Sequence, residues 1–159
     1  MTHHHTGVLL VAHHERHDAA VLARAAAEWL TGHGHDVWMT RDDAAAVGMD
    51  DYGADHAPGD ADLAVCIGGD GTMLRTVHLL RGSAVPVIGV NVGVLGYLTE
   101  VEPPALAASL ERFFAGPAEG NWTIDERMMV DLTLRRHGVD VQTWTALNEG
   151  VVEKQESAR

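Results

Sequence analysis

The sequence contains little cysteine and no long apolar run. Its single cysteine excludes an internal disulfide framework and favours a reducing compartment. No apolar run approaches the roughly 20 residues that cross a bilayer, so we expect no membrane association. The N-terminus has no basic segment followed by a long apolar one, so no signal peptide is predicted. Together these absences favour a cytoplasmic protein.

Basic residues are also few. The chain has 11 Lys and Arg against 23 Asp and Glu, which gives a net charge of −12 with histidine neutral. Nonspecific nucleic-acid binding requires a basic surface, so no nucleic-acid partner is expected. A small anionic ligand is still compatible with this charge, because backbone amides, a local arginine or a metal ion can bind it.

Eleven histidines raise the question of a metal site. The run at residues 3–5 is short and terminal. Residues 13–17 read His-His-Glu-Arg-His, which is not the His-Glu-x-x-His helix motif, because the glutamate has the wrong position between the histidines. This segment also follows a predicted strand, where a helical face is absent. We therefore predict no metal-ligating residues in the chain.

The N-terminal third reads as a β-α-β unit. Gly7–Ala12 is a continuous apolar run typical of a buried parallel strand. Asp18 is a plausible N-cap for a helix over Ala19–Leu30, and Asp36–Thr40 is a second short strand. Such a unit predicts a right-handed crossover in an open α/β sheet. No Gly-x-Gly-x-x-Gly fingerprint follows the first strand, so the ordinary Rossmann mode of NAD binding is not supported.

The segment from Arg41 to Ala61 is polar and rich in aspartate. Its acidic residues do not have the spacing of an EF-hand. We interpret it as a mobile surface loop, with at most one helical turn at residues 44–47.

A glycine-rich turn is the centre of the sequence. The apolar run Leu63–Ile67 leads into Gly68-Gly69-Asp70-Gly71-Thr72, and a helical pattern follows from Thr72 to about Leu80. This order predicts a buried strand, a tight turn with unusual backbone angles, and a helix N-terminus whose free amides favour phosphate. A plain strand-to-helix turn capped by Asp or Thr is the alternative.

The middle of the chain continues the α/β pattern. Val85–Val90 is predicted to be a buried strand, and the loop Asn91–Thr99 follows its carboxyl end, where ligands bind in open α/β sheets. Tyr97 in this loop either stacks on a base or plugs the loop. A helix over Ala105–Phe114 follows two prolines, and Gly116-Pro117 marks a domain boundary.

From Asn121 the apolar pattern becomes alternating. Met128–Arg135 and Val139–Leu147 flank the turn signal His137-Gly138, which predicts an antiparallel hairpin. Residues 151–154 are a candidate continuation. We therefore divide the chain into an α/β domain over residues 1–117 and the start of a β-rich domain over residues 118–159.

Three motifs together resemble those of the NAD kinases, in particular the bacterial type. The turn at residues 68–72 is shared with lipid kinases and, in related form, phosphofructokinases. Gly89–Glu100 resembles the NAD kinase segment Gly-Val-Asn-x-Gly-x-Leu-Gly-Phe-Leu-Thr-Glu, and Ala146–Glu149 resembles its Ala-Leu-Asn-Glu. The likeness runs from about Val8 to the end of the chain. It implies an open, mostly parallel, Rossmann-like first domain followed by an all-β domain.

The resemblance also implies a reaction. NAD kinases transfer a phosphoryl group from ATP, or from inorganic polyphosphate in some members, to the 2′-hydroxyl of the adenosine ribose of NAD. A divalent cation, expected to be Mg²⁺, would offset phosphate charge. The family further suggests a homodimer or homotetramer.

The roles of individual residues follow from the same resemblance. Asp70 would take or orient the 2′-hydroxyl proton, and backbone amides at the glycine turn would hold the donor phosphates. The expected phosphate-binding residues are Gly68, Gly69, Gly71 and Thr72. The expected NAD-binding residues are Asp70, Gly71, Arg75, Tyr97, Asn148 and Glu149. For Arg75 the alternative is an ordinary surface arginine.

Some features depart from the family pattern. Tyr97 replaces the usual Phe, and Val94 stands where many bacterial members have Lys or Arg. The family's later Thr-Pro-Thr-Gly-Ser-Thr-Ala-Tyr-like segment is absent, so the chain resembles a truncated form. Two alternatives therefore stay open: a lipid or sugar kinase with the same glycine turn, and a truncated, inactive nucleotide-binding fragment.

Overall fold

The computed structural model describes residues 6–94, 96–118 and 121–152. The histidine run at 3–5, Leu95 of the predicted loop, and Glu153 and Lys154 lie outside these ranges. The chain separates into two compact units, Met1–Thr123 and Ile124–Arg159. In the described part of the chain, no helix has the length and apolarity needed to cross a membrane.

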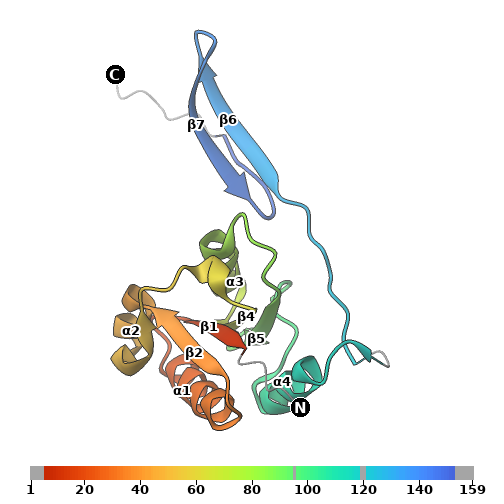
Figure 1. Cartoon of the computed structure of the whole chain (residues 1–159). Coiled ribbons are helices and arrows are strands. Elements are labelled where there is room, and N and C mark those ends of the chain that lie inside the picture. The colour runs from red at the N-terminus through yellow and green to blue at the C-terminus, as the bar shows by residue number, and fades with distance from the viewer. Residues whose placement is uncertain (1–5, 95, 119–120, 153–159) are drawn as a thin grey trace. The chain divides into compact units, whose positions relative to one another are not determined.

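The first unit is built on a five-stranded sheet in which every pairing is parallel (Figure 1). The strand order is β3-β2-β1-β4-β5. The strands are β1 (Gly7–Ala12), β2 (Asp36–Thr40), β3 (Gly53–Ala54), β4 (Leu63–Gly68) and β5 (Val87–Asn91). The α/β prediction is confirmed, and the first two predicted strands have the predicted bounds.

Helices cover both faces of this sheet. They are α1 (His17–Gly32), α2 (Arg41–Val47), α3 (Asp70–Leu80) and α4 (Leu106–Phe114), with short 3₁₀ helices η1 (Asp50–Tyr52), η2 (Pro58–Asp60) and η3 (Pro103–Ala105). Side chains alternate across β1, so Val8 and Leu10 pack in one core cluster with α1 and α4. Leu9 packs in the other cluster with Leu80 of α3. Both faces are therefore buried, as the continuous apolar run predicts.

The strand order reverses beside β1. From β1 the chain runs outward through β2 to β3, then returns to place β4 on the other side of β1. In open α/β sheets, loops that leave two neighbouring strands in opposite directions open a crevice at the carboxyl ends of those strands. Here the crevice lies between the segments that follow Ala12 and Gly68.

Several predicted boundaries need correction. The strand predicted over Val85–Val90 is Val87–Asn91, and the first hairpin strand begins at Val130 rather than Met128.

Two helices begin earlier than predicted. The first helix begins at His17 with Arg16 as its N-cap, so Asp18 is not the cap; its carboxylate instead accepts a hydrogen bond from Ala19 N at 3.0 Å. The glycine-turn helix begins at Asp70, two residues before the predicted start. In both cases the helix begins two residues before the predicted start, because an acidic side chain is also favourable inside a first turn.

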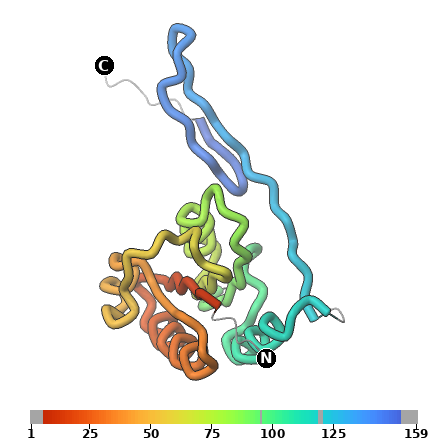
Figure 2. The backbone as a smooth tube through the Cα atoms, in the orientation of Figure 1, coloured from red at the N-terminus to blue at the C-terminus, as the bar shows by residue number. Residues whose placement is uncertain are grey.

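The prediction of a mobile loop over residues 41–61 is wrong. The segment forms α2, η1, β3 and η2 in succession, and the chain passes along the edge of the sheet, where β3 pairs with β2 (Figure 2). Thr40 Oγ1 caps α2 by accepting from Asp43 N at 3.2 Å. Ala44 and Met49 are buried in the core, and β3 pairs with β2. Burial of these few apolar side chains orders a segment whose composition alone suggested a loop.

The second unit contains an antiparallel hairpin of β6 (Val130–Arg136) and β7 (Val139–Ala146). His137 and Gly138 have φ of 49° and 80°, which fits a two-residue turn of the mirror-image type that hairpins favour. The hairpin prediction is confirmed. Val151 and Val152 do not continue it as strand.

Candidate functional site

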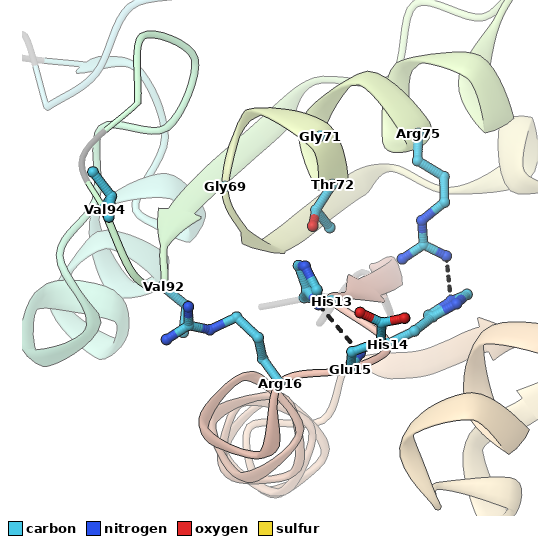
Figure 3. A pocket seen from close by; sticks show the side chains of 10 residues that line it. All are labelled: His13, His14, Glu15, Arg16, Gly69, Gly71, Thr72, Arg75, Val92 and Val94. Carbon is cyan, nitrogen blue, oxygen red and sulfur yellow. Dashed lines mark hydrogen bonds between the residues drawn. The ribbon is translucent and has the colours of Figure 1, made fainter.

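A cavity of about 490 Å³ lies at the strand-order reversal (Figure 3). One wall is the loop after β1, residues 13–16. A second wall is the start of α3, with Gly69, Gly71, Thr72 and Arg75. Val92 and Val94, which follow β5, complete it. The cavity thus joins three segments that each leave the carboxyl end of a parallel strand, where the open sheet is expected to bind ligands.

Close packing at Gly68, rather than a left-handed backbone conformation, is what requires glycine in this turn. Positive φ occurs at other described glycines such as Gly93, but at none of Gly68, Gly69 and Gly71. The prediction of unusual angles at these three is therefore wrong. A β-carbon at Gly68 would instead overlap Thr72 Oγ1 and lie 2.7 Å from Thr72 Cβ. Glycine is needed there so that α3 can begin directly against the end of β4.

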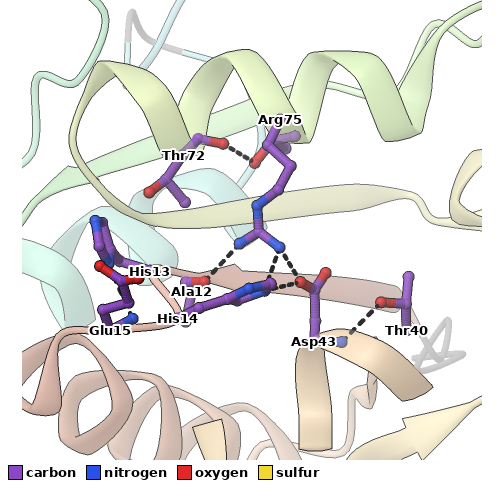
Figure 4. A network of polar contacts seen from close by, with 9 residues as sticks. Ala12, His13, His14, Glu15, Thr40, Asp43, Thr72 and Arg75 are labelled. Atoms are coloured by element: carbon purple, nitrogen blue, oxygen red, sulfur yellow. Dashed lines mark hydrogen bonds and ion pairs between the residues drawn. The ribbon is translucent and has the colours of Figure 1, made fainter. Parts of the chain in front are cut away.

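Arg75 is held by a buried carboxylate (Figure 4). Its Nη1 forms an ion pair with Asp43, which is 2% exposed, and its Nη2 donates to Ala12 O at 2.6 Å. His14 Nε2 lies 2.5 Å from Asp43 Oδ1 and 2.5 Å from Arg75 Nη1. Arg75 is therefore not an ordinary surface arginine, since its guanidinium links α3, α2 and the end of β1.

Arg16 supplies a second guanidinium on the cavity wall. Figure 3 shows its side chain extending from the β1–α1 loop toward Val92. A β-carbon at Gly93 would lie 2.7 Å from Arg16 Nη1, so the side chain lies against that backbone. Asp18 accepts from Arg16 Nε at 3.1 Å and Nη2 at 2.7 Å. This hydrogen-bonded pair raises the pKa of Arg16 and lowers the pKa of Asp18, so both stay charged.

The carboxylate of Asp70 is bound by backbone amides of a different loop. Tyr97 N donates to Oδ2 at 3.0 Å, and Leu98 N donates to Oδ1 at 2.9 Å. Gly69 and Gly71 line the cavity, but Asp70 is not among the described residues that do. The carboxylate therefore lies beside the cavity and faces the loop that follows β5.

The remaining predicted residues fall in two places. The Tyr97 side chain is 93% exposed, so it does not plug its loop; base stacking stays a prediction. Asn148 and Glu149 belong to the second unit, where they follow β7 and are exposed. Their contact with NAD also stays a prediction.

Sequence reasoning missed the residues at 13–16 and Asp43. The sequence pattern gives residues 13–16 no ligand role and places Asp43 in a surface loop. The sequence signal that could have found them is their position after a strand. Residues 13–16 follow β1 and Asp43 follows β2, and the carboxyl ends of both strands lie at the same edge of the sheet as that of β4. Among the described residues, no group of three or more His, Cys, Asp or Glu side chains is arranged to hold a metal ion.

Comparison with known proteins identifies this arrangement. The family model described as the ATP-NAD kinase N-terminal domain matches residues 8–118, which include all of the five-stranded sheet except Gly7 and every described residue that lines the cavity. The chain belongs to the NAD kinase family. The predicted family is thereby confirmed.

Individual relatives agree with the NAD kinase assignment. The NAD kinase of Syntrophotalea carbinolica is 35% identical over 144 residues, which are 89% of this chain and 49% of that protein. The NAD kinase of Aromatoleum aromaticum is 34% identical over 156 residues, or 96% of this chain and 51% of that protein. The chain thus spans about half the length of these two NAD kinases.

A solved structure has a similar fold. The crystal structure of yeast NADH kinase, described as complexed with NADH, aligns with a TM-score of 0.68 at 17% identity. The alignment covers 90% of this chain and 47% of that one. At this identity the likeness bears on the fold alone, and it supports the α/β architecture described above.

Proposed function

We propose that this chain is part of an NAD kinase that phosphorylates the 2′-hydroxyl of the adenosine ribose of NAD, with ATP or inorganic polyphosphate as donor. The observation that carries the proposal is the cavity at the strand-order reversal, formed by the glycine turn of a chain that belongs to this family. Asp70, the first residue of α3, stands between two residues that line it.

The cavity has the chemistry of a phosphate site. The first amides of α3 have no partner within the helix, and the helix dipole favours an anion there. Arg16 and Arg75 border the same space and bring guanidinium groups that suit phosphate oxygens. We assign the donor phosphates to this cavity, held by amides at Gly68, Gly69, Gly71 and Thr72.

Mg²⁺ fits this site as a cation carried by the donor phosphates. Mg²⁺ is commonly bound by one or two carboxylates plus substrate phosphates, and the described residues offer no larger ligand group. When bound, the cation would neutralise part of the negative charge of the phosphates.

The reaction needs an acceptor for one proton. As the ribose 2′-oxygen forms its bond to the terminal phosphorus, the bond from that phosphorus to the donor's bridging oxygen breaks. The 2′-hydroxyl proton passes to the Asp70 carboxylate. Such transfer depends chiefly on positioning and on neutralising charge, which the two arginines and the helix amides provide.

The acceptor side of the site is assigned to six residues, of which Gly71 and Arg75 line the cavity. We propose that Arg75, Tyr97, Asn148 and Glu149 contact NAD, together with Asp70 and Gly71. We further propose a division into an α/β domain over residues 1–117 and an incomplete β-rich domain over 118–159. The whole enzyme is proposed to be cytoplasmic, to supply NADP and to assemble as a homodimer or homotetramer.

The test is NADP formation from NAD with Mg-ATP or Mg-polyphosphate. It compares the chain with its Asp70→Asn variant, and repeats both in the chain extended by whatever follows Arg159 in the reading frame. We expect the variant to lose about 10²- to 10⁴-fold in kcat, the range for loss of a proton acceptor. If neither length acts on NAD but either phosphorylates a lipid or a sugar, the NAD kinase proposal is wrong.

A further inference from the structure

The carboxylate of Asp70 is held at both oxygens. Oδ2 accepts from Tyr97 N at 3.0 Å, and Oδ1 accepts from Leu98 N at 2.9 Å. Two donors from adjacent peptide units fix the rotation of the carboxylate plane, which a single hydrogen bond does not do. Hydrogen bonds to a charged acceptor are also stronger than neutral ones.

The two amides are themselves fixed, because the chain that follows them is bonded to β5. Glu100 N and Val101 N donate to Gly89 O at 3.2 and 3.0 Å, and Asn91 N donates to Val101 O at 2.8 Å. Thr99 is 3% exposed. The amides at Tyr97 and Leu98 therefore extend from a segment anchored to the sheet.

Gly96 makes room for this contact. A β-carbon at Gly96 would overlap Asp70 Oδ1 and lie 2.6 Å from Asp70 Cγ. Gly96 is not among the glycines with positive φ, so its backbone angles do not demand glycine. In the described structure, the close approach of the Asp70 carboxylate is the only feature that requires glycine at position 96.

We infer that the segment Gly96–Leu98 is a positioning device for Asp70. Its amides use one lone pair on each carboxylate oxygen, and a carboxylate has about two on each, so each oxygen keeps one for a substrate hydroxyl. The inference rests on the proposed function in one respect, that Asp70 accepts the substrate proton. Tyr97 thus contributes through its backbone, apart from any stacking by its ring.

The first test is amide hydrogen exchange in the 159-residue chain, comparing wild type with Asp70→Asn. A carboxamide presents one acceptor oxygen and one donor group, so it cannot accept from both amides. We expect at least one of the amides of Tyr97 and Leu98 to exchange about tenfold faster in the variant. The amide of Val101, bonded to Gly89 O, is the internal reference and should not change. Unchanged exchange at both Tyr97 and Leu98 would overturn the inference.

The second test is Gly96→Ala, with Gly32→Ala as matched control. A β-carbon at Gly32 meets nothing within 4 Å, so the control adds the same methyl group in open space. We expect Gly96→Ala to speed exchange at Tyr97 and Leu98 and to lower kcat about a hundredfold, since displacement of a reacting group by about 1 Å costs that much. The KM for the donor should stay within twofold, because neither Gly96 nor Asp70 lines the cavity.

The outcomes separate the two proposals. If Gly96→Ala keeps wild-type kcat while Asp70→Asn is inactive, the positioning inference fails and the NAD kinase proposal stands. If kcat and donor KM change together, the effect is general damage, and the inference fails as well. If the wild-type enzyme does not act on NAD, the proposed function fails, while amide exchange in Asp70→Asn still decides whether the loop holds the carboxylate.

Discussion

The backbone of Gly68 lies directly against the side chain of Thr72, one helical turn further along the chain. A β-carbon at Gly68 would overlap Thr72 Oγ1 and lie 2.7 and 3.1 Å from Thr72 Cβ and Cγ2. Thr72 is 5% exposed and begins the row of buried side chains on α3. This contact fixes how closely the helix follows the strand, and with it the position of the amides at the cavity.

Gly68→Ala should therefore destabilise the first unit by about 1–3 kcal/mol, the usual cost of overpacking a buried site. The control is Gly71→Ala, where the added methyl group meets nothing within 4 Å and lies in the first turn of α3. Alanine is favoured over glycine in a helix by about 1 kcal/mol, so the control should be neutral or stabilising. Urea unfolding followed by circular dichroism measures both. Equal stability of the two variants would contradict the packing account.

Asp43→Asn tests the buried ion pair with Arg75. Removing one partner leaves the other charge without compensation, which costs about 3–5 kcal/mol for fully buried pairs. The Arg75 side chain is 31% exposed, so water replaces part of the loss and we expect about 2 kcal/mol. Thermal unfolding of the chain provides the measurement.

The matched control for this change is Asp55→Asn. Asp55 pairs with Arg41 at 2.6 Å, but both side chains are mostly exposed. Exposed ion pairs contribute about 0–1 kcal/mol, so the control should unfold close to wild type. If both aspartates give the same loss, burial of Asp43 has no special role in holding Arg75.

Arg16→Gln tests the assignment of donor phosphates to the cavity. Losing a charge-assisted hydrogen bond to phosphate should raise the donor KM about tenfold and leave the KM for NAD nearly unchanged. Arg24→Gln is the control, because its side chain has the same 40% exposure and also pairs with an aspartate, Asp51, away from the cavity. Initial-rate kinetics with each donor decide the matter. An equal effect of both changes would point to net charge alone and remove Arg16 from the site.

Burial of the Cys66 thiol leads us to predict that the folded chain loses stability at high pH. Burial raises the pKa of its thiol from 9.0 to about 11. Between these values the unfolded chain has lost the thiol proton while the folded chain keeps it, so the folded state binds more protons and stability falls as pH rises. A shift of this size corresponds to about 2–3 kcal/mol.

The comparison that isolates this effect uses Cys66→Ala. Between about pH 8 and about pH 11, wild type should lose roughly 2 kcal/mol more stability than the variant, measured by urea unfolding at each pH. Tyrosines and lysines titrate in both proteins, so their contributions cancel in the difference. Parallel pH profiles would show that the thiol is not held in its neutral form.

Local pattern in the sequence determined most of the elements. The apolar runs at residues 7–12 and 63–67 predicted buried parallel strands, and the His137-Gly138 signal predicted the hairpin turn. These features are readable because side-chain periodicity and turn chemistry act within a few residues. The glycine turn predicted a strand-to-helix junction for the same reason, and the three motifs together identified the family.

The tertiary structure decided which segments meet. Strand order places the loop after β1 beside the glycine turn, although residues 13–16 and 69 are far apart in sequence. Asp43 reaches Arg75 across 32 positions, and Asp70 meets the amide of Leu98 across 28. The composition of residues 41–61 also predicted a loop, whereas the burial of Ala44 and Met49 orders the segment. Strand order and such burial depend on how the whole sheet packs, and no local period encodes them.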